Sequence, residues 1–120
     1  MIQIYHNSRC QKSRMALNLL IESGKTHQVI NYLVNPPSES ELKIVVEKIG
    51  IEPLQIVRSK EKIWIENYKN KVEHPDQIIP ILSSNPVLIE RPIVVFESVA
   101  FIVRTDEQLK QLALRLKSDF

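Results

Sequence analysis

The chain has 120 residues, the size of one independent folding unit that buries a core without metal ions or disulfides. Its 43% hydrophobic and 25% charged residues, with only two glycines, exclude a low-complexity or disordered chain. The formal net charge of +2 is too small to indicate nucleic-acid binding, which needs basic residues gathered on one face. We therefore expect one globular domain over residues 1–120 and no nucleic-acid partner.

The first ten residues lack the basic stretch and apolar run of a signal peptide, and no window has the apolar length of a membrane span. We therefore expect a cytoplasmic protein without a membrane partner. The chain has one cysteine, Cys10, which excludes an internal disulfide and a four-cysteine zinc site. Cys10 is thus either a buried apolar side chain or a working thiol.

The chain opens with the pattern of a strand, a loop and a helix. Residues 2–5 alternate between apolar and polar side chains, which is typical of a strand. Residues 6–10 form a polar loop that ends on the cysteine. Apolar side chains at helical spacing then predict a helix over residues 12–23, and Gly24 is placed to end it in a left-handed conformation.

A second strand and a second helix follow. Residues 29–34 read as a strand that Asn-Pro-Pro at 35–37 closes, so the chain begins with a βαβ unit. Ser38 and Glu41 have the spacing of a capping box, in which each residue bonds the other's backbone at a helix start. The helix that they open is expected to end at Gly50.

The middle of the chain predicts a helical insertion over roughly residues 38–85. After its first helix, residues 53–57 predict a short helical segment that a proline opens. Residues 61–72 mix charged and apolar side chains and suggest a surface segment rather than a clean core helix. Residues 76–82 look helical, although Pro80 predicts that this helix is short or kinked.

The C-terminal third predicts a hairpin followed by a helix. Residues 92–96 and 100–103 are apolar runs at hairpin spacing, so they are expected to pair antiparallel. Thr105 and Gln108 give a last capping box before an amphipathic helix. The element order predicts an α/β fold with a mixed sheet and helices on both faces.

The surroundings of Cys10 favour a reactive thiol. A free thiol with a pKa of about 8.5 is only about 3% ionised at pH 7, and a helix N-terminus or nearby positive charge raises that fraction. Cys10 falls between a strand and a helix start, where His6, Arg9 and Lys12 can add positive charge and Ser13 can offer a hydroxyl. Such polar neighbours argue against a buried, inert cysteine.

Several segments resemble one known family in the same order. Residues 5–14, Tyr-His-Asn-Ser-Arg-Cys-Gln-Lys-Ser-Arg, resemble the active-site segment of the glutaredoxin-coupled arsenate reductases. The likeness continues at residues 32–38, at residues 57–58, at residues 86–95 with Glu-Arg-Pro-Ile, and at Arg104. The resemblance implies a thioredoxin-like, three-layer fold with a mixed sheet.

The resemblance also implies roles for particular residues. It assigns Cys10 as the nucleophile and Pro92 as the residue after a cis peptide bond. The oxyanion-binding residues are Arg58, Arg91 and Arg104, and the residues that support the thiolate are His6, Asn7 and Ser13. Guanidinium groups suit arsenate, because they neutralise its charge and bind its oxygens through forked hydrogen bonds. Taken singly, each arginine could have a structural explanation instead: Arg58 and Arg104 as solvated surface charges, and Arg91 as an ion-pair partner of Glu90.

The implied reaction is arsenate reduction through a covalent adduct on Cys10. Because the chain has no second cysteine, the electrons come from outside the protein. The resemblance implies glutathione and glutaredoxin as the external reductants and partners, and no bound cofactor or metal.

The match departs from the better-known reductases beside the thiol. These carry Pro-x-Cys-Gly-Thr-Ser, whereas this chain has Ser8 in place of the proline and Gln11 and Lys12 in place of Gly-Thr. Two alternatives therefore stay open: a glutathione-linked thiol oxidoreductase with another substrate, and a redox-sensing module that binds another protein. Ser13 stands where regulators of this fold have a second cysteine, which excludes an internal disulfide switch.

Overall fold

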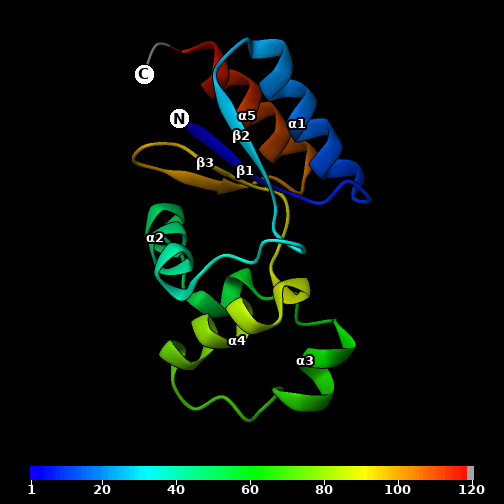
Figure 1. Ribbon diagram of the computed structural model, residues 1–120, viewed down its shortest axis with the longest axis vertical. Helices are drawn as coiled ribbons and strands as arrows, with labels where there is room; N and C mark the ends of the chain where they lie inside the picture. Colours follow the sequence, from blue (N-terminus) through cyan, green and yellow to red (C-terminus); the bar gives the residue numbers. More distant parts are fainter. Residues whose placement is uncertain (119–120) are drawn as a thin grey trace.

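The centre of the structure, a computed structural model that describes residues 1–118, is a four-stranded sheet in the order β2-β1-β3-β4 (Figure 1). Residues 119 and 120, the end of the expected domain, lie outside the described part. The strands are β1 (Ile2–His6), β2 (His27–Asn31), β3 (Ile93–Val95) and β4 (Ala100–Ile102). β1 pairs parallel with β2 and antiparallel with β3, which pairs antiparallel with β4. The predicted mixed sheet is confirmed.

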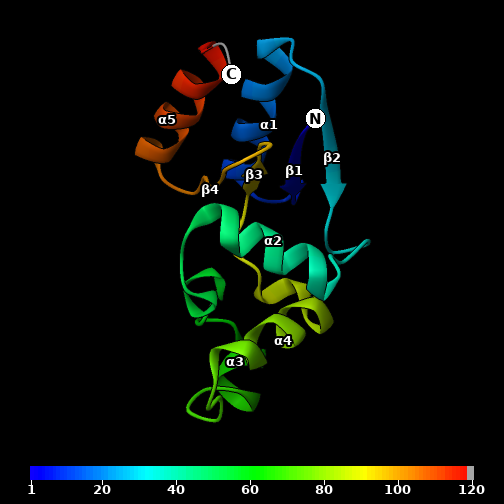
Figure 2. The ribbon, with the colours of Figure 1, turned by 90° about the vertical axis from the view of Figure 1, so that its left-hand side faces the viewer.

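Helices cover both faces of this sheet. α1 (Gln11–Ser23) and α5 (Asp106–Lys117) pack together on one face, and α2 (Glu39–Ile49) lies against the other (Figure 2). The remaining helical segments between β2 and β3 are η1 (Pro53–Ile56), α3 (Lys62–Asn67), η2 (Pro75–Gln77), α4 (Ile78–Ser84) and η3 (Pro86–Leu88). They extend the molecule beyond one end of the sheet, which gives it dimensions of 43 × 27 × 26 Å.

The two-residue period of the strands builds a separate core on each face of the sheet. Ile4 of β1 and Val94 of β3 pack with α1 and α5 in one apolar cluster. Tyr5 and Val95, one position along each strand, pack with α2 and α4 in the other cluster. Successive side chains of a strand point to opposite faces, so the same short strands contribute to both clusters.

The predicted helix ends agree with the structure. Gly24 and Gly50 follow α1 and α2 with φ of 72° and 79°, a left-handed conformation that glycine adopts without strain. The backbone N–H of Glu41 donates to Oγ of Ser38 over 3.2 Å, and the Glu41 carboxylate accepts from the Ser38 backbone over 3.1 Å. The capping box before α5 is likewise present.

The strand expected over residues 29–34 is misplaced. β2 begins two residues earlier and ends at Asn31, which pairs with His6, the last residue of β1. The chain then turns, and the backbone N–H groups of Val34 and Asn35 both donate to the carbonyl of Asn31. Among the strands of residues 1–118, β2 lies at the edge of the sheet beside β1, so it ends where that neighbour ends.

One expectation in the helical insertion also needs correction. Residues 61–72 contain a helix, α3, because Trp64 turns inward and is only 5% exposed. α4 is short, with seven residues that end at Ser84, as Pro80 predicted. Pro80 lies in the first turn of that helix, where backbone N–H groups have no partner within the helix, so the missing N–H costs little.

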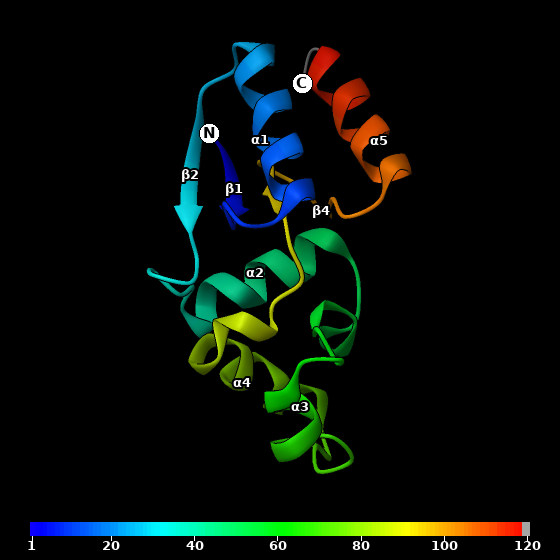
Figure 3. The same ribbon diagram turned by 90° about the vertical axis from the view of Figure 1, so that its right-hand side faces the viewer.

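The loop between β1 and α1 lies at the end of the sheet that faces α2, α3 and α4 (Figures 1 and 3). β1 runs toward this end, and α1 starts there and runs back along the sheet. The start of α1 therefore lies at the boundary between the sheet and the helical insertion. Within residues 1–118, no helix has the length and apolar character needed to cross a membrane.

Candidate functional site

Cys10 is the residue that caps the N-terminus of α1. Its backbone is extended, its N–H donates to the carbonyl of Asn7 over 3.0 Å, and its own carbonyl accepts from the N–H of Arg14. The thiol is half-buried, its side chain makes no capping hydrogen bond, and the first turn of α1 holds no acidic residue. The positive end of this helix is thus available to stabilise negative charge at the thiol.

Ser13 organises the loop from inside the first turn of α1. Its hydroxyl is fully buried, lies 2.6 Å from Nδ1 of His6 and accepts from the backbone N–H of Asn7 over 2.9 Å. When Nδ1 carries the proton of His6 and donates it to Ser13, the Ser13 hydroxyl keeps its own proton for a further acceptor. The three residues predicted to support the thiolate therefore form one hydrogen-bonded group beside Cys10.

His6 does not supply the positive charge expected from its position. Burial lowers the pKa of His6, the hydrogen bond with Ser13 opposes this shift, and the charge of Arg14 adds to it. A lowered pKa favours the neutral imidazole at neutral pH. His6 thus acts on the loop through its hydrogen bond with Ser13.

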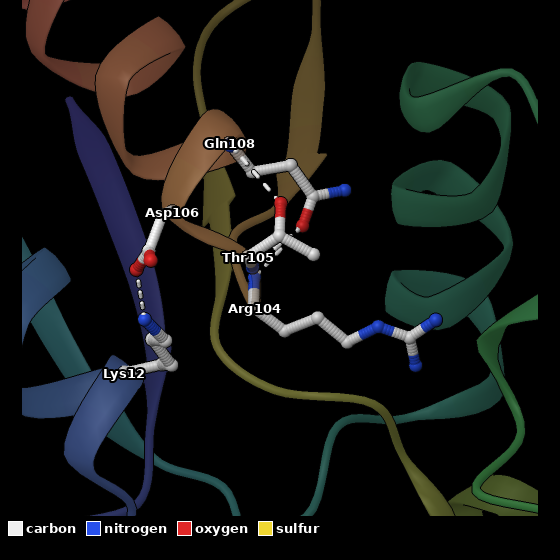
Figure 4. Close-up of polar contacts among 5 residues, drawn as sticks. All are labelled: Lys12, Arg104, Thr105, Asp106 and Gln108. Carbon is white, nitrogen blue, oxygen red and sulfur yellow. Dashed lines mark hydrogen bonds and ion pairs between the residues drawn. The ribbon is translucent and has the colours of Figure 1, made fainter.

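Lys12, two residues after Cys10, forms an ion pair with Asp106 at the start of α5 (Figure 4). Its hydrogen bond and charge lower the pKa of Asp106. The pair is on the surface, and the Asp106 side chain is 83% exposed. The positive charge expected beside Cys10 is therefore shared with a carboxylate, and the pair connects the N-termini of α1 and α5.

Two of the three predicted anion-binding arginines meet at a buried carboxylate. Glu90 is only 7% exposed and forms ion pairs with Arg58 and with Arg104. Nε of Arg58 lies 3.8 Å from Oε1 of Glu90, and its Nη1 lies 2.7 Å from Oε1 of Glu61. The Arg104 side chain extends away from Lys12, as Figure 4 shows. Arg58 and Arg104 are thus brought together by Glu90.

The backbone explains why Arg58 and Glu90 meet. The N–H of Arg58 donates to the carbonyl of Leu88 over 2.7 Å, and the N–H of Glu90 donates to the carbonyl of Ile56 over 2.8 Å. Between them, Val57 and Ile89 form an antiparallel bridge. Two segments that lie about thirty residues apart in the chain are thereby fixed side by side.

Arg91 is placed differently from the other two arginines. The ion pairs of Glu90 are with Arg58 and Arg104 rather than with its sequence neighbour Arg91. Nε of Arg91 is buried and has no hydrogen-bond partner among residues 1–118. The peptide bond from Arg91 to Pro92 is cis, as the resemblance implies. Arg91 therefore has a buried donor that is left for a ligand.

Tyr32 connects the arginines to the cysteine loop. It follows β2 directly and is only 1% exposed. Burial raises the pKa of its hydroxyl, whereas the charge of Arg91, a hydrogen bond with the Asn7 side chain and the charge of Arg58 lower it, and Cys10 raises it further. The Tyr32 hydroxyl is thus within electrostatic reach of Cys10, Arg58 and Arg91.

A pocket of about 530 Å³ opens beside this group of charges. Arg58, Lys60, Glu61, Glu90 and Arg104 are among the residues that line it. Among residues 1–118, no group of three or more His, Cys, Asp and Glu side chains is arranged to hold a metal ion. The polar lining is suited to a small charged ligand.

Sequence reasoning assigned no role to Glu90, Tyr32 or Asp106. Glu90 stood out only as a neighbour of Arg91, and Tyr32 only as part of a matching segment. Their roles depend on contacts with residues far along the chain: Glu90 with Arg58, Tyr32 with Asn7, and Asp106 with Lys12. The one signal in the sequence was a charged residue, Glu90, directly after the apolar run of residues 87–89.

Comparison with known proteins identifies the family. The ArsC family model matches residues 5–112. An arsenate reductase of Neisseria meningitidis serogroup A is 37% identical over 111 residues, covering 91% of this chain and 95% of that protein. The uncharacterized Escherichia coli K12 protein YfgD is 36% identical over 113 residues, covering 92% of this chain and 95% of that one.

A solved structure confirms the expected thioredoxin-like fold. An arsenate reductase from Vibrio cholerae superposes with a TM-score of 0.84 at 38% identity, covering 92% of this chain and 96% of that chain. The family match and the fold agree with the resemblance in the cysteine and arginine segments. This chain therefore belongs to the ArsC family.

Proposed function

We propose that this protein reduces arsenate to arsenite through a covalent intermediate on Cys10. The observation that carries the proposal is the lone thiol at the N-terminus of α1, in a fold whose arginines gather at the same end of the sheet. Relatives named arsenate reductase support the choice of substrate.

In this proposal, the arginine side chains bind arsenate. Arsenate is an anion at neutral pH, so a thiolate attacks it only where positive groups offset the repulsion. Arg91 has a buried Nε without a hydrogen-bond partner in the described chain, and the α1 N-terminus adds a positive electrostatic potential at Cys10. Arg58 and Arg104 provide further donors on the pocket side.

In the first step, the Cys10 thiolate forms a bond from sulfur to arsenic. One arsenate hydroxyl takes up a proton from solvent and leaves as water as its bond to arsenic breaks, so arsenic stays in its pentavalent state in the adduct. The Ser13 hydroxyl, which His6 and Asn7 hold in place, supports the thiolate before this attack.

In the second step, glutathione supplies the electrons. Its thiolate attacks the sulfur of Cys10, the electron pair of the sulfur–arsenic bond passes to arsenic, and arsenite leaves. Two thiols are thereby oxidised to a mixed disulfide as arsenic gains two electrons. Glutaredoxin then reduces that disulfide and restores Cys10. These reductants belong to the cytosol, where the proposal places the protein.

The test is arsenate-dependent NADPH oxidation coupled through glutathione, glutathione reductase and glutaredoxin. We expect turnover in the natural protein and in Ser8→Ala, an exposed position of the same loop, and none in Cys10→Ser. Turnover in Cys10→Ser at the natural rate would end the proposal. Turnover with a disulfide substrate but not with arsenate would instead identify a general glutathione-linked thiol oxidoreductase.

Arg91→Ala tests the anion site separately from the thiol. Removing the guanidinium is expected to raise KM for arsenate about tenfold or more, because one charge-assisted contact with the anion is lost. Lys43→Ala removes an exposed positive charge from α2 and serves as the matched control. Unchanged arsenate kinetics in Arg91→Ala would show that this residue is not part of the site.

A further inference from the structure

Glu90 is an unusual residue to find in an anion site. It lies between Arg58 and Arg104, it is only 7% exposed, and it lines the same pocket as both arginines. The bridge between Val57 and Ile89 fixes its backbone, and the two ion pairs together with burial hold the carboxylate in place. An anion that enters this pocket therefore meets a carboxylate as well as guanidiniums.

The carboxylates reduce the charge available for an anion. Glu90 pairs with Arg58 and Arg104, and Glu61 pairs with Arg58 from the more exposed side. The charged side chains that line the pocket are three cations, Arg58, Lys60 and Arg104, and two carboxylates, Glu61 and Glu90, which leave one net positive charge. A site of this kind cannot select its ligand by negative charge alone.

Hydrogen bonding offers a second means of selection. An ionised carboxylate only accepts hydrogen bonds, so Glu90 binds well only to a ligand that brings a donor. Arsenate and phosphate carry at least one hydroxyl group at neutral pH, whereas sulfate carries none. A hydroxyl of the first two anions can donate to Glu90 while their other oxygens accept from arginine. Sulfate would place an oxygen lone pair against the carboxylate.

We propose that Glu90 is a specificity-determining residue that makes this site select tetrahedral oxyanions bearing a hydroxyl and reject those without one. The inference rests on the oxyanion site of the proposed function and adds the chemical class of anion that the site takes. A buried carboxylate discriminates against a ligand that brings no donor, because two hydrogen-bond acceptors are then forced together away from water.

The test compares equilibrium binding of inorganic phosphate and of sulfate to the full chain by calorimetry at neutral pH and constant ionic strength. We expect the natural protein to bind phosphate at least about tenfold more tightly than sulfate. Glu90→Gln, which replaces one carboxylate oxygen with a donor, should tighten sulfate binding and remove most of this preference. Glu61→Gln removes the other carboxylate on Arg58 and should keep the preference.

Glu90→Asn provides a second neutral side chain should the melting temperature of Glu90→Gln show that it does not fold. An unchanged ratio of phosphate to sulfate affinity in whichever variant folds would overturn the inference, as would a natural protein that binds neither anion. Neither anion is reduced, so the result does not depend on turnover. Absence of arsenate reduction together with a Glu90-dependent phosphate preference would reject the reductase and retain the role of Glu90.

Discussion

Ser13 is the single residue on which the geometry of the Cys10 loop most depends. Ser13→Ala removes the acceptor of the Asn7 N–H and the partner of His6 from a fully buried position. We expect a loss of about 1–3 kcal/mol in the free energy of unfolding, because a buried donor is left unsatisfied. We also expect slower alkylation of Cys10 by iodoacetamide at neutral pH, because the thiolate loses support.

The measurements are urea denaturation and the pH profile of the alkylation rate. Ser8→Ala is the matched control, since Ser8 is exposed in the same loop and only its carbonyl has a described partner, Arg14. Equal alkylation profiles in Ser13→Ala and the natural protein would show that the Ser13 hydroxyl does not support the thiolate.

His6 makes stability depend on pH in a defined direction. Its pKa is lower in the folded chain, mainly through burial, so the unfolded chain takes up a proton first as pH falls. Stability associated with His6 is therefore full above the ordinary histidine pKa of about 6.5 and declines below it. Between about pH 7.5 and 5.5, His6→Asn should lose less stability than the natural protein does.

Urea midpoints at the two pH values measure this difference. His74→Asn, which replaces an exposed histidine outside the Cys10 loop, is the control variant. The same pH-dependent loss in His6→Asn and the natural protein would contradict the burial of a neutral His6.

The parts of the site that lie close together in the sequence were predictable, and those supplied by distant segments were not. His6, Asn7, Cys10 and Ser13 lie within eight residues, so their association follows from a strand, a turn and a helix start. The pairing of Glu90 with Arg58 and Arg104 follows only from tertiary structure, because three separate segments supply the three charges. No local pattern shows which of two neighbouring charges, Glu90 or Arg91, turns toward a distant partner.

At the scale of elements, helix caps test how far local sequence determines local structure. Ser38→Ala removes the side-chain acceptor at the start of α2 and should cost about 1 kcal/mol of the free energy of unfolding. Ser40→Ala changes an exposed position two residues further along the same helix and should alter stability by less than about 0.5 kcal/mol. Equal urea midpoints for the two variants would show that the capping box contributes nothing.

Helices whose ends are marked by local sequence signals were predicted well. Elements whose length or burial depends on a partner elsewhere in the chain were not. The ends of α1 and α2 were predictable because glycine and the capping box act locally. β2 was misplaced because its length is set by β1, and α3 was underestimated because Trp64 finds its burial against distant residues. Hydrophobic pattern indicates a strand but not how much of it has a partner.

At the scale of the whole molecule, the sheet joins two cores into one cooperative unit. β1 and β3 contribute side chains to both apolar clusters, so neither cluster can unfold without disrupting strands that the other needs. We expect a single unfolding transition in urea, as small domains commonly show. Trp64, the sole tryptophan, reports on the helical insertion by fluorescence, and far-UV circular dichroism reports on the whole chain.

Coincident midpoints by the two probes would support a single domain over the chain. A Trp64 transition at clearly lower urea, with much of the circular dichroism signal retained, would show that the insertion between β2 and β3 unfolds on its own.

The burial of Glu90 between two arginines also bears on how these positions change during evolution. Loss of Arg104 first would leave a buried carboxylate with one partner fewer, at a cost of about 1–3 kcal/mol in stability. Loss of Glu90 first would leave Arg104, whose side chain is 58% exposed, free to be hydrated at little cost. The stability cost of replacing both residues therefore depends on the order of replacement. Lineages are expected to replace Glu90 before Arg104, and to retain Arg104 wherever the carboxylate remains.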